Sequence, residues 1–232
     1  MDLNAFEIDD DLMEIAVLIM ERAVEITKSK QFIDAMRISE GSAKLKIGRM
    51  INDDKIIEFY GVDKGNNDIN GAYFSNCVVS PFIYRNVAFM SSEHWFQIMK
   101  FLNVPLNDNN LIKFSAIKGI SKKETQEKCN AVANKMLGFT PVYVAQFGRR
   151  CREVPIRDFW ESSRTYYMAC ALYLKFTTSN DLFRQKLLST GDAVLIERAP
   201  NDNYWAISTK TSKGQNMLGA LLMATREFIR SK

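Results

Sequence analysis

Residues 92–102 read SEHWFQIMKFL. The run after Ser92, a good helix cap, predicts a helix that begins at Glu93. At about 100° per residue, Glu93, Gln97 and Lys100 share one stripe, while apolar side chains cover most of the remaining surface. A helix that is apolar nearly all round is buried, so its polar stripe faces either bulk water or a polar cavity. A solvent-facing stripe is the simpler interpretation, and a partly buried acid–base pair of Glu93 and Lys100 is the alternative.

Helix signals dominate the chain after this stretch, and strand signals are short. Amphipathic patterns predict helices at residues 111–118, 122–137, 158–176, 182–188 and 217–229. Short apolar runs predict strands or irregular edge strands at residues 56–60, 73–76, 78–84 and 193–198. Short strands among many helices indicate a compact, mainly helical α+β domain.

The first 54 residues differ from the rest and predict a helical N-terminal extension, which precedes a main domain at residues 55–232. Apolar residues recur at helical spacing between Leu12 and Ile26, after an acidic helix start, and a second helical stretch follows at residues 31–38. The simpler interpretation is a stripe that packs on the main domain. Self-association or partner docking through residues 1–50 is the alternative.

Composition excludes several classes of protein. Of the 232 residues, 47% are apolar, which is typical of a globular protein. The net charge of +4 is small for a protein that binds nucleic acid. The longest apolar run, residues 15–20, is far too short to span a bilayer. Four cysteines without a CxxC pair and a single histidine, His94, argue against a disulfide framework and a metal site. We expect a cytoplasmic protein with no membrane partner and no metal.

A second group of polar residues lies near the C-terminus. Glu197 ends the last predicted strand, Asp202 and Trp205 follow it in an acidic and aromatic loop, and Asn216 precedes the last helix. Free N–H groups at that helix start would suit a phosphate, and the loop would suit a ribose under a base. An ordinary polar turn is the simpler interpretation. Arg149 lies in the densest basic segment, which is either a solvated loop or a rim that attracts anions.

Motifs along the chain resemble the NADAR (YbiA-like) family from about Ile56 to the C-terminus. The matching segments are Phe59-Tyr60-Gly61, Phe74-Ser75-Asn76, Ser92-Glu93-His94-Trp95-Phe96-Gln97, Lys100-Phe101, Gly148-Arg149, Trp160-Glu161-Ser162, Leu195-Ile196-Glu197, Asn201-Asp202-Asn203-Tyr204-Trp205 and Asn216. The resemblance implies a mainly helical α+β domain and an N-glycosidase that needs no cofactor.

The same resemblance implies roles for individual residues. Glu93, Lys100 and Asp202 are the expected catalytic residues. The expected substrate-binding residues are Phe59, Tyr60, Ser75, Asn76, Gln97, Arg149, Trp160, Glu197, Trp205 and Asn216. A carboxylate would stabilise the positive charge that develops on ribose, and an aromatic ring would stack on the leaving base. Direct attack by water and a Schiff base on Lys100 both remain open.

The substrate implied by the family is an ADP-ribosyl or phosphoribosyl compound. Removal of ADP-ribose from guanine in nucleic acid is the first expectation, and cleavage of early phosphoribosylated riboflavin intermediates is the second. A module that binds ADP-ribose or NAD without cleaving it is the alternative from another class. The chain departs from the family at residues 206–208, where Ala-Ile-Ser replaces the usual Gly-Asp-Gly, which bears on substrate choice more than on reaction class.

Overall fold

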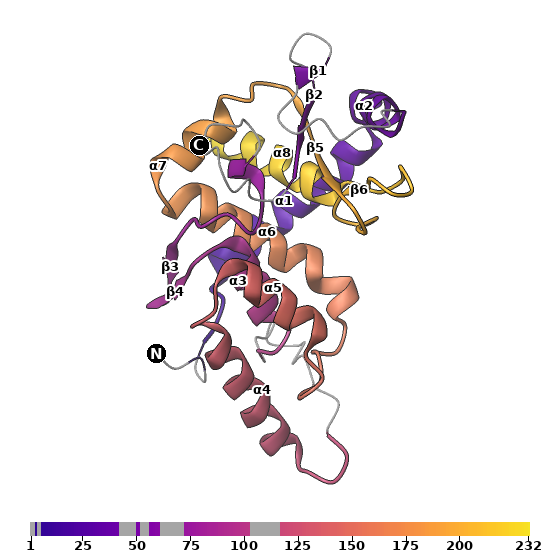
Figure 1. Cartoon of the computed structure of the whole chain (residues 1–232). Coiled ribbons are helices and arrows are strands. Elements are labelled where there is room, and N and C mark those ends of the chain that lie inside the picture. The colour runs from indigo at the N-terminus through magenta and orange to yellow at the C-terminus, as the bar shows by residue number, and fades with distance from the viewer. Residues whose placement is uncertain (1–2, 4–5, 42–49, 52–55, 61–71, 103–116) are drawn as a thin grey trace. The chain divides into compact units, whose positions relative to one another are not determined.

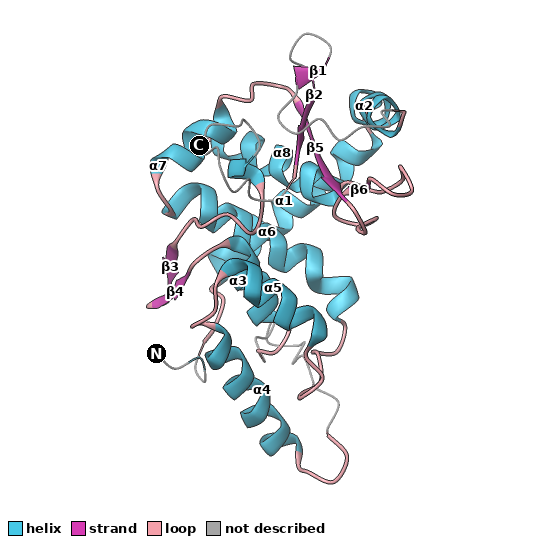
Figure 2. Cartoon of the chain, viewed as in Figure 1, coloured by secondary structure: helices cyan, strands magenta, loops and turns pink. Residues whose placement is uncertain are grey.

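The computed structural model describes residues 3, 6–41, 50–51, 56–60, 72–102 and 117–232. The chain, which Figure 1 traces, divides into two compact units. The first unit comprises residues 1–17 and 79–179, and the second comprises residues 18–78 and 180–232. Figure 2 shows that helices predominate and that strands are short, so the predicted α+β class is confirmed.

The first unit is built from a hairpin and a group of packed helices. Strands β3 (Phe82–Tyr84) and β4 (Val87–Phe89) pair antiparallel. The helices are α3 (Ser92–Met99), α4 (Lys122–Met136), α5 (Pro141–Arg150) and α6 (Trp160–Thr178). Helix α3 contacts α4, α5 and α6, and it also contacts β4, so the helix predicted from residues 92–102 lies at the core of this unit.

The hairpin turn anchors residues from the start of the chain. Arg85 and Asn86 have φ values of 50° and 62°, which is the pattern of a two-residue type I′ turn. Arg85 lies 3.3 Å from a carboxylate oxygen of Asp9, whose backbone N–H donates to the Tyr84 hydroxyl at 2.9 Å. The Phe6 ring packs edge-on against Trp95 of α3, with ring centroids 5.7 Å apart. Phe6 and Ile8 are therefore part of the core of the first unit, and Asp9 is anchored at its edge.

The second unit contains a four-stranded sheet in the order β1-β2-β5-β6. Its strands are β1 (Met50–Ile51), β2 (Ile56–Phe59), β5 (Val194–Ala199) and β6 (Ile207–Ser208). Strand β1 is antiparallel to β2, whereas β2, β5 and β6 run parallel. All of β2 and most of β5 are buried, as expected for parallel strands that are covered on both faces.

Helices cover this sheet and complete the second unit. They are α2 (Lys30–Glu40), α7 (Asp181–Leu188) and α8 (Met217–Arg230), with a short 3₁₀ helix, η2, at Ala72–Phe74. Both α2 and α8 contact β5, and α7 contacts α8. Helix α1 (Asp10–Lys28) begins in the first unit and ends in the second, and its residues Leu12, Ala16, Ile19, Ala23 and Ile26 are buried.

Some local predictions were wrong, each for a local reason. Ser91 caps α3 in place of Ser92, because its hydroxyl accepts the His94 N–H at 3.2 Å. The strand expected at residues 73–76 is partly the 3₁₀ helix η2. Helix α5 was missed because Pro141 is typical of a helix end as well as of a first turn. The helix expected at residues 111–118 lies mostly outside the described residues.

A charged cluster is buried between α2 and the sheet of the second unit. Glu58 on β2 and Arg198 on β5 are 1% and 2% exposed, and their nearest side-chain atoms are 3.5 Å apart. The Ser39 hydroxyl on α2 donates to Glu58 and accepts from Arg198 at 2.7 Å. Because uncompensated buried charges are strongly destabilising, this cluster holds α2 against β2 and β5.

Replacing Arg198 with Met should lower the free energy of unfolding by about 3–5 kcal/mol, because Glu58 would be buried without its cation. Replacing both Glu58 and Arg198 with Met removes both charges, so we expect most of that loss to be recovered. Urea denaturation of the wild type and the two variants measures both effects. A double variant as unstable as Arg198→Met would contradict the assignment.

Candidate functional site

Helix α3 places Glu93, Gln97 and Lys100 on one face inside the first unit. Glu93 and Lys100 are each 8% exposed and Gln97 is 3% exposed, so the stripe is buried and does not face bulk water. The Gln97 amide N–H donates to Glu93 Oε1 at 2.7 Å. Gln97 Oε1 is buried and has no hydrogen-bond partner among the described residues. A ligand hydroxyl placed there would satisfy an acceptor that is costly to leave unpaired.

Helix α5 approaches this stripe closely, and a glycine makes that possible. A Cβ atom on Gly148 would lie 2.2 Å from Gln97 Oε1, so a larger residue would displace the amide. The next residue, Arg149, is exposed, and its charge acts on Lys100. Gly148 thus sets the distance between α5 and the polar stripe, while Arg149 supplies positive charge near it.

Aromatic rings cover the ammonium group of Lys100. Its Nζ lies 5.5 Å from the centre of the Phe96 ring and 5.8 Å from the centre of the Trp160 ring. Those two rings lie 5.0 Å apart. The motif resemblance assigned Trp160 to the site, and the structure adds Phe96 as a second ring beside the amine.

Burial is the main influence on the acidity of Lys100. It lowers the pKa of the amine from 10.5 to about 8, while the charge of Glu93 opposes this and that of Arg149 reinforces it. About a tenth of the amine is therefore unprotonated at pH 7, and this is the form that can act as a nucleophile or a base.

Two residues that the sequence analysis did not assign to the site support it. The Arg157 N–H donates to the Lys100 carbonyl at 2.9 Å, and the Arg157 guanidinium donates to the Tyr167 hydroxyl. The Tyr167 ring stacks on Trp160 at 5.8 Å with an interplanar angle of 14°. Arg157 is 2% exposed, and burial lowers its pKa. An arginine next to Asp158 in a charged segment gives no local signal for this role, because its partners are known only after folding.

The loop after β5 contains the predicted residues Asp202 and Trp205 of the second unit. Asp202 Oδ1 accepts the N–H groups of Tyr204 and Trp205 at 2.9 Å and 2.8 Å. The rings of Tyr204 and Trp205 then meet edge-on, 4.9 Å apart. One carboxylate oxygen of Asp202 therefore shapes the aromatic loop.

The Asn216 side chain forms hydrogen bonds with β5 of the kind that a neighbouring strand would form. Its amide oxygen accepts the Glu197 N–H at 2.9 Å, and its amide nitrogen donates to the Leu195 carbonyl at 2.9 Å. The residue is fully buried and has a φ of 51°, a left-handed conformation that asparagine tolerates better than most residues. The side chain that the sequence assigns to substrate thus has both polar ends engaged by backbone.

At the start of α8, the sequence predicted free N–H groups that could bind a phosphate, and the structure shows two of them engaged. The Met217 and Leu218 N–H groups donate to the Tyr204 and Trp205 carbonyls at 3.0 Å and 3.1 Å. These donors are therefore already used by the aromatic loop. Glu197 is half-buried on β5, beside the Asn216 amide.

The remaining predicted residues lie at the ends of β2 and η2 in the second unit. Phe59 is fully buried against Phe74, with ring centroids 5.6 Å apart, and Tyr60 is half-buried. The Ser75 hydroxyl is buried and accepts the Cys77 N–H at 3.3 Å, and Asn76 is half-buried. The described part of the chain gathers no group of three acidic, histidine or cysteine side chains able to hold a metal ion.

Comparison with known proteins decides the family. A sequence profile described as the NADAR domain matches residues 59–230. The chain belongs to the NADAR family. The N-glycosidase YbiA of Escherichia coli K12 is 33% identical over 174 residues, which is 75% of this chain and 88% of YbiA. The NMR structure of E. coli YbiA is 29% identical in sequence and has a TM-score of 0.54. The match covers 82% of this chain and 94% of the YbiA chain.

A plant relative matches a shorter region of this NADAR protein. A maize protein named chloroplastic riboflavin biosynthesis protein PYRR is 31% identical over 140 residues, which is 59% of this chain and 19% of the maize protein. The family predicted from the sequence motifs is therefore confirmed, and its named relatives include N-glycosidases. No helix in the described ranges is both long and apolar enough to cross a membrane.

Lys100→Met should stabilise the NADAR protein near neutral pH. The unfolded chain binds the Lys100 proton more tightly than the folded chain does, so protonated Lys100 lowers the free energy of unfolding. This destabilisation is fully present below about pH 8 and disappears as the pH rises through 10.5. We expect a gain of up to about 3 kcal/mol near pH 7 that shrinks toward zero by pH 10.5. Urea denaturation across this range measures it, with the exposed Lys123→Met as a control. A constant difference at all pH values would contradict the assignment.

Asn216→Ala separates a structural role from a binding role. It removes two buried hydrogen bonds and forces alanine into a left-handed conformation, so we expect a loss of about 3 kcal/mol in the free energy of unfolding. The exposed Asn201→Ala should change it by about 0.5 kcal/mol or less. Unchanged stability with weakened substrate binding would show instead that Asn216 contacts the substrate.

Proposed function

We propose that this NADAR protein is an N-glycosidase that hydrolyses a ribose N-glycosidic bond in an ADP-ribosyl or phosphoribosyl substrate, without a metal ion or cofactor. The proposal rests on the buried stripe of Glu93, Gln97 and Lys100 beside the rings of Phe96 and Trp160. A carboxylate, an amine of lowered pKa and stacked aromatic rings are the groups that cleavage of a nucleoside-like bond requires.

Glu93 is the proposed carboxylate of the reaction. As the bond between ribose and the base nitrogen breaks, positive charge develops on the sugar, and a buried carboxylate stabilises it strongly. The same carboxylate can take a proton from the attacking water, and that proton then passes to the leaving nitrogen. The Gln97 amide holds Glu93 in place through its hydrogen bond at 2.7 Å.

Lys100 offers a second route through a covalent intermediate. Its neutral amine forms a bond to the anomeric carbon as the bond to the base nitrogen breaks, and one amine proton passes to the leaving nitrogen. Opening of the ring then moves the second amine proton to the ring oxygen and leaves an imine. Water hydrolyses the imine, which releases the sugar and restores the amine. A pKa of about 8 supports this route, because the amine is partly neutral under physiological conditions. Borohydride would reduce the imine and leave a stable adduct on Lys100, whereas direct attack by water leaves none.

The proposed first substrate is ADP-ribose on guanine in nucleic acid. The exposed Arg149, whose charge acts near Lys100, and the net charge of +4 both favour an anionic target. The four cysteines are free thiols, which suits a proposed location in the reducing cytoplasm. The name of the maize relative favours a second candidate, in which the substrate is an early phosphoribosylated intermediate of riboflavin synthesis.

A cleavage assay with Glu93→Gln tests the proposal. We expect the wild type to release free ADP-ribose from ADP-ribosylated guanine DNA, or ribose phosphate from the riboflavin intermediates, as measured by mass spectrometry. Glu93→Gln should lower the turnover rate by at least about a hundredfold while binding is retained, since the amide cannot carry the negative charge. Addition of EDTA should leave the wild-type rate unchanged.

The exposed Glu153→Gln serves as the matched control, because it makes the same chemical change at the surface of the first unit. It should keep the wild-type rate. Binding of ADP-ribose by a wild type that cuts neither substrate would overturn the proposal in favour of a non-catalytic ADP-ribose or NAD-binding module.

A further inference from the structure

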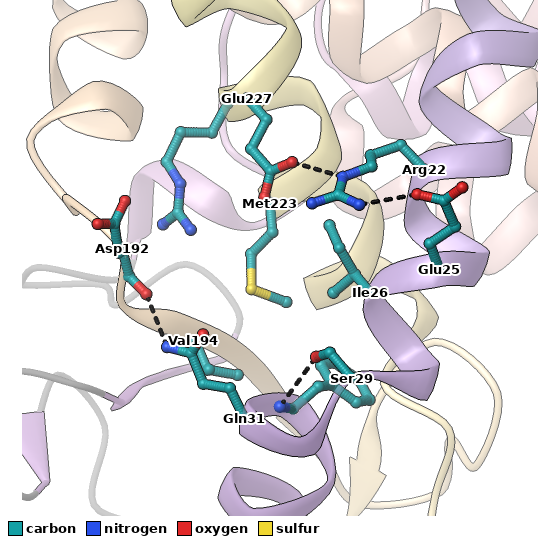
Figure 3. Close-up of a pocket in the computed structure, with 11 residues that line it drawn as sticks. Arg22, Glu25, Ile26, Ser29, Gln31, Asp192, Val194, Met223 and Glu227 are labelled. Atoms are coloured by element: carbon teal, nitrogen blue, oxygen red, sulfur yellow. Dashed lines mark hydrogen bonds and ion pairs between the residues drawn. The ribbon is translucent and has the colours of Figure 1, made fainter.

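The second unit contains a pocket that none of the predicted site residues lines. Its volume is about 290 Å³, at the lower end of the range of about 300–1,000 Å³ for small-molecule sites. The walls come from α1, α2, the turn before β5, β5 itself and α8 (Figure 3). About half of the lining residues lie between Arg22 and Phe32, outside the matched region at residues 59–230. The pocket is thus built by N-terminal residues together with the NADAR domain.

Arg226 is a buried cation in the wall of this pocket. It is 3% exposed, and its guanidinium donates to the Thr190 hydroxyl at 2.7 Å and to the Ala193 carbonyl at 2.9 Å. Both partners are neutral, and Arg226 Nε has no hydrogen-bond partner among the described residues. Burial lowers its pKa to about 10. A guanidinium in such a place is usually paired with an anion, because a buried charge without one is costly.

The carboxylates around the pocket are already paired with other arginines. Figure 3 shows Arg22 between Glu227 and Glu25, at distances of 2.6 Å and 2.7 Å. The Asp192 carboxylate pairs with Arg230 at 2.8 Å. These ion pairs leave Arg226 as a cation that, within the described ranges, forms no ion pair with an acidic side chain.

Apolar side chains form the rest of the pocket. Ile26 on α1 and Met223 on α8 extend toward each other in Figure 3, with Val194 of β5 beside them. These three side chains and Phe32 of α2 are buried. The pocket therefore combines one buried cation with a small apolar wall, which is the arrangement that binds an anionic head group joined to an apolar body.

We propose that this pocket binds a small organic monoanion, with a carboxylate group on Arg226 and an apolar body against Ile26, Phe32, Val194 and Met223. A monoanion would give this guanidinium a charged hydrogen-bond partner, since its present partners, Thr190 and Ala193, are neutral. A dianion such as a phosphate monoester is disfavoured, because the negative charges of Asp192 and Glu227 act on the same place. The forked guanidinium suits a planar carboxylate.

Titration of the full-length protein, labelled with ¹⁵N and with ¹³C in the Ile and Met methyl groups, with benzoate tests the proposal. We expect saturable shifts of the Arg226 Nε–Hε signal and of the Ile26 and Met223 methyl signals. Benzamide has the same shape without the charge, so it should bind at least about tenfold more weakly, and inorganic phosphate at constant ionic strength should shift these signals little. Shifts that do not saturate, or equal binding of benzoate and benzamide or phosphate, would overturn the proposal.

Two variants sharpen this test. Arg226→Lys keeps the charge and loses the fork, so benzoate affinity should fall at least about tenfold. Arg184→Gln removes an exposed arginine of α7 and should leave affinity unchanged. Undiminished binding by Arg226→Lys would also overturn the proposal. Should that variant fail to fold, the comparison of benzoate with benzamide on the native chain decides the question by itself.

Discussion

The burial of α3 on every side is the constraint on which the site depends. All eight residues of this helix are buried, including Glu93 and Gln97, and Lys100 follows directly at its end. Because the apolar residues of α3 pack against other elements of the first unit, its polar stripe is carried inside with them. The carboxylate, the amide and the amine therefore interact in a medium of low polarity, where charges act strongly and the Lys100 amine loses much of its basicity.

The surroundings of α3 are matched to that burial. Because Gly148 has no side chain, α5 can lie so close to α3 that a Cβ atom at this position would collide with Gln97. On another side, Arg157 and Tyr167 hold Trp160 in a stack beside Lys100. These contacts come from three separate elements, so the environment of Lys100 is a property of the packed unit and not of the helix alone.

The second unit uses polar side chains as substitutes for secondary structure. The Asn216 amide bonds to β5 where a neighbouring strand would otherwise bond, and Asp202 gathers the N–H groups of its own loop. Ser39, from α2, completes the buried cluster of Glu58 and Arg198. Ser39 and Phe6 both precede the region matched by the NADAR profile, so residues before that region are part of the core of each unit.

Local patterns in the amino-acid sequence were sufficient to predict the start of α3 within one residue, its polar stripe, the ends of α4 and α8 within one residue, and the family, whereas α3 ends at Met99 and not near residue 103 as predicted. Helical periodicity and capping depend on neighbouring residues, so the sequence alone determines them. Tertiary structure alone decided that the stripe is buried, that Asn216 bonds to a strand, and that Arg157 supports Trp160 through Tyr167. Glu58 and Arg198 are 140 residues apart, and Ser39 and Arg198 are 159 apart. Burial and pairing across such separations depend on which surfaces lose water when the chain folds, and no local pattern encodes that.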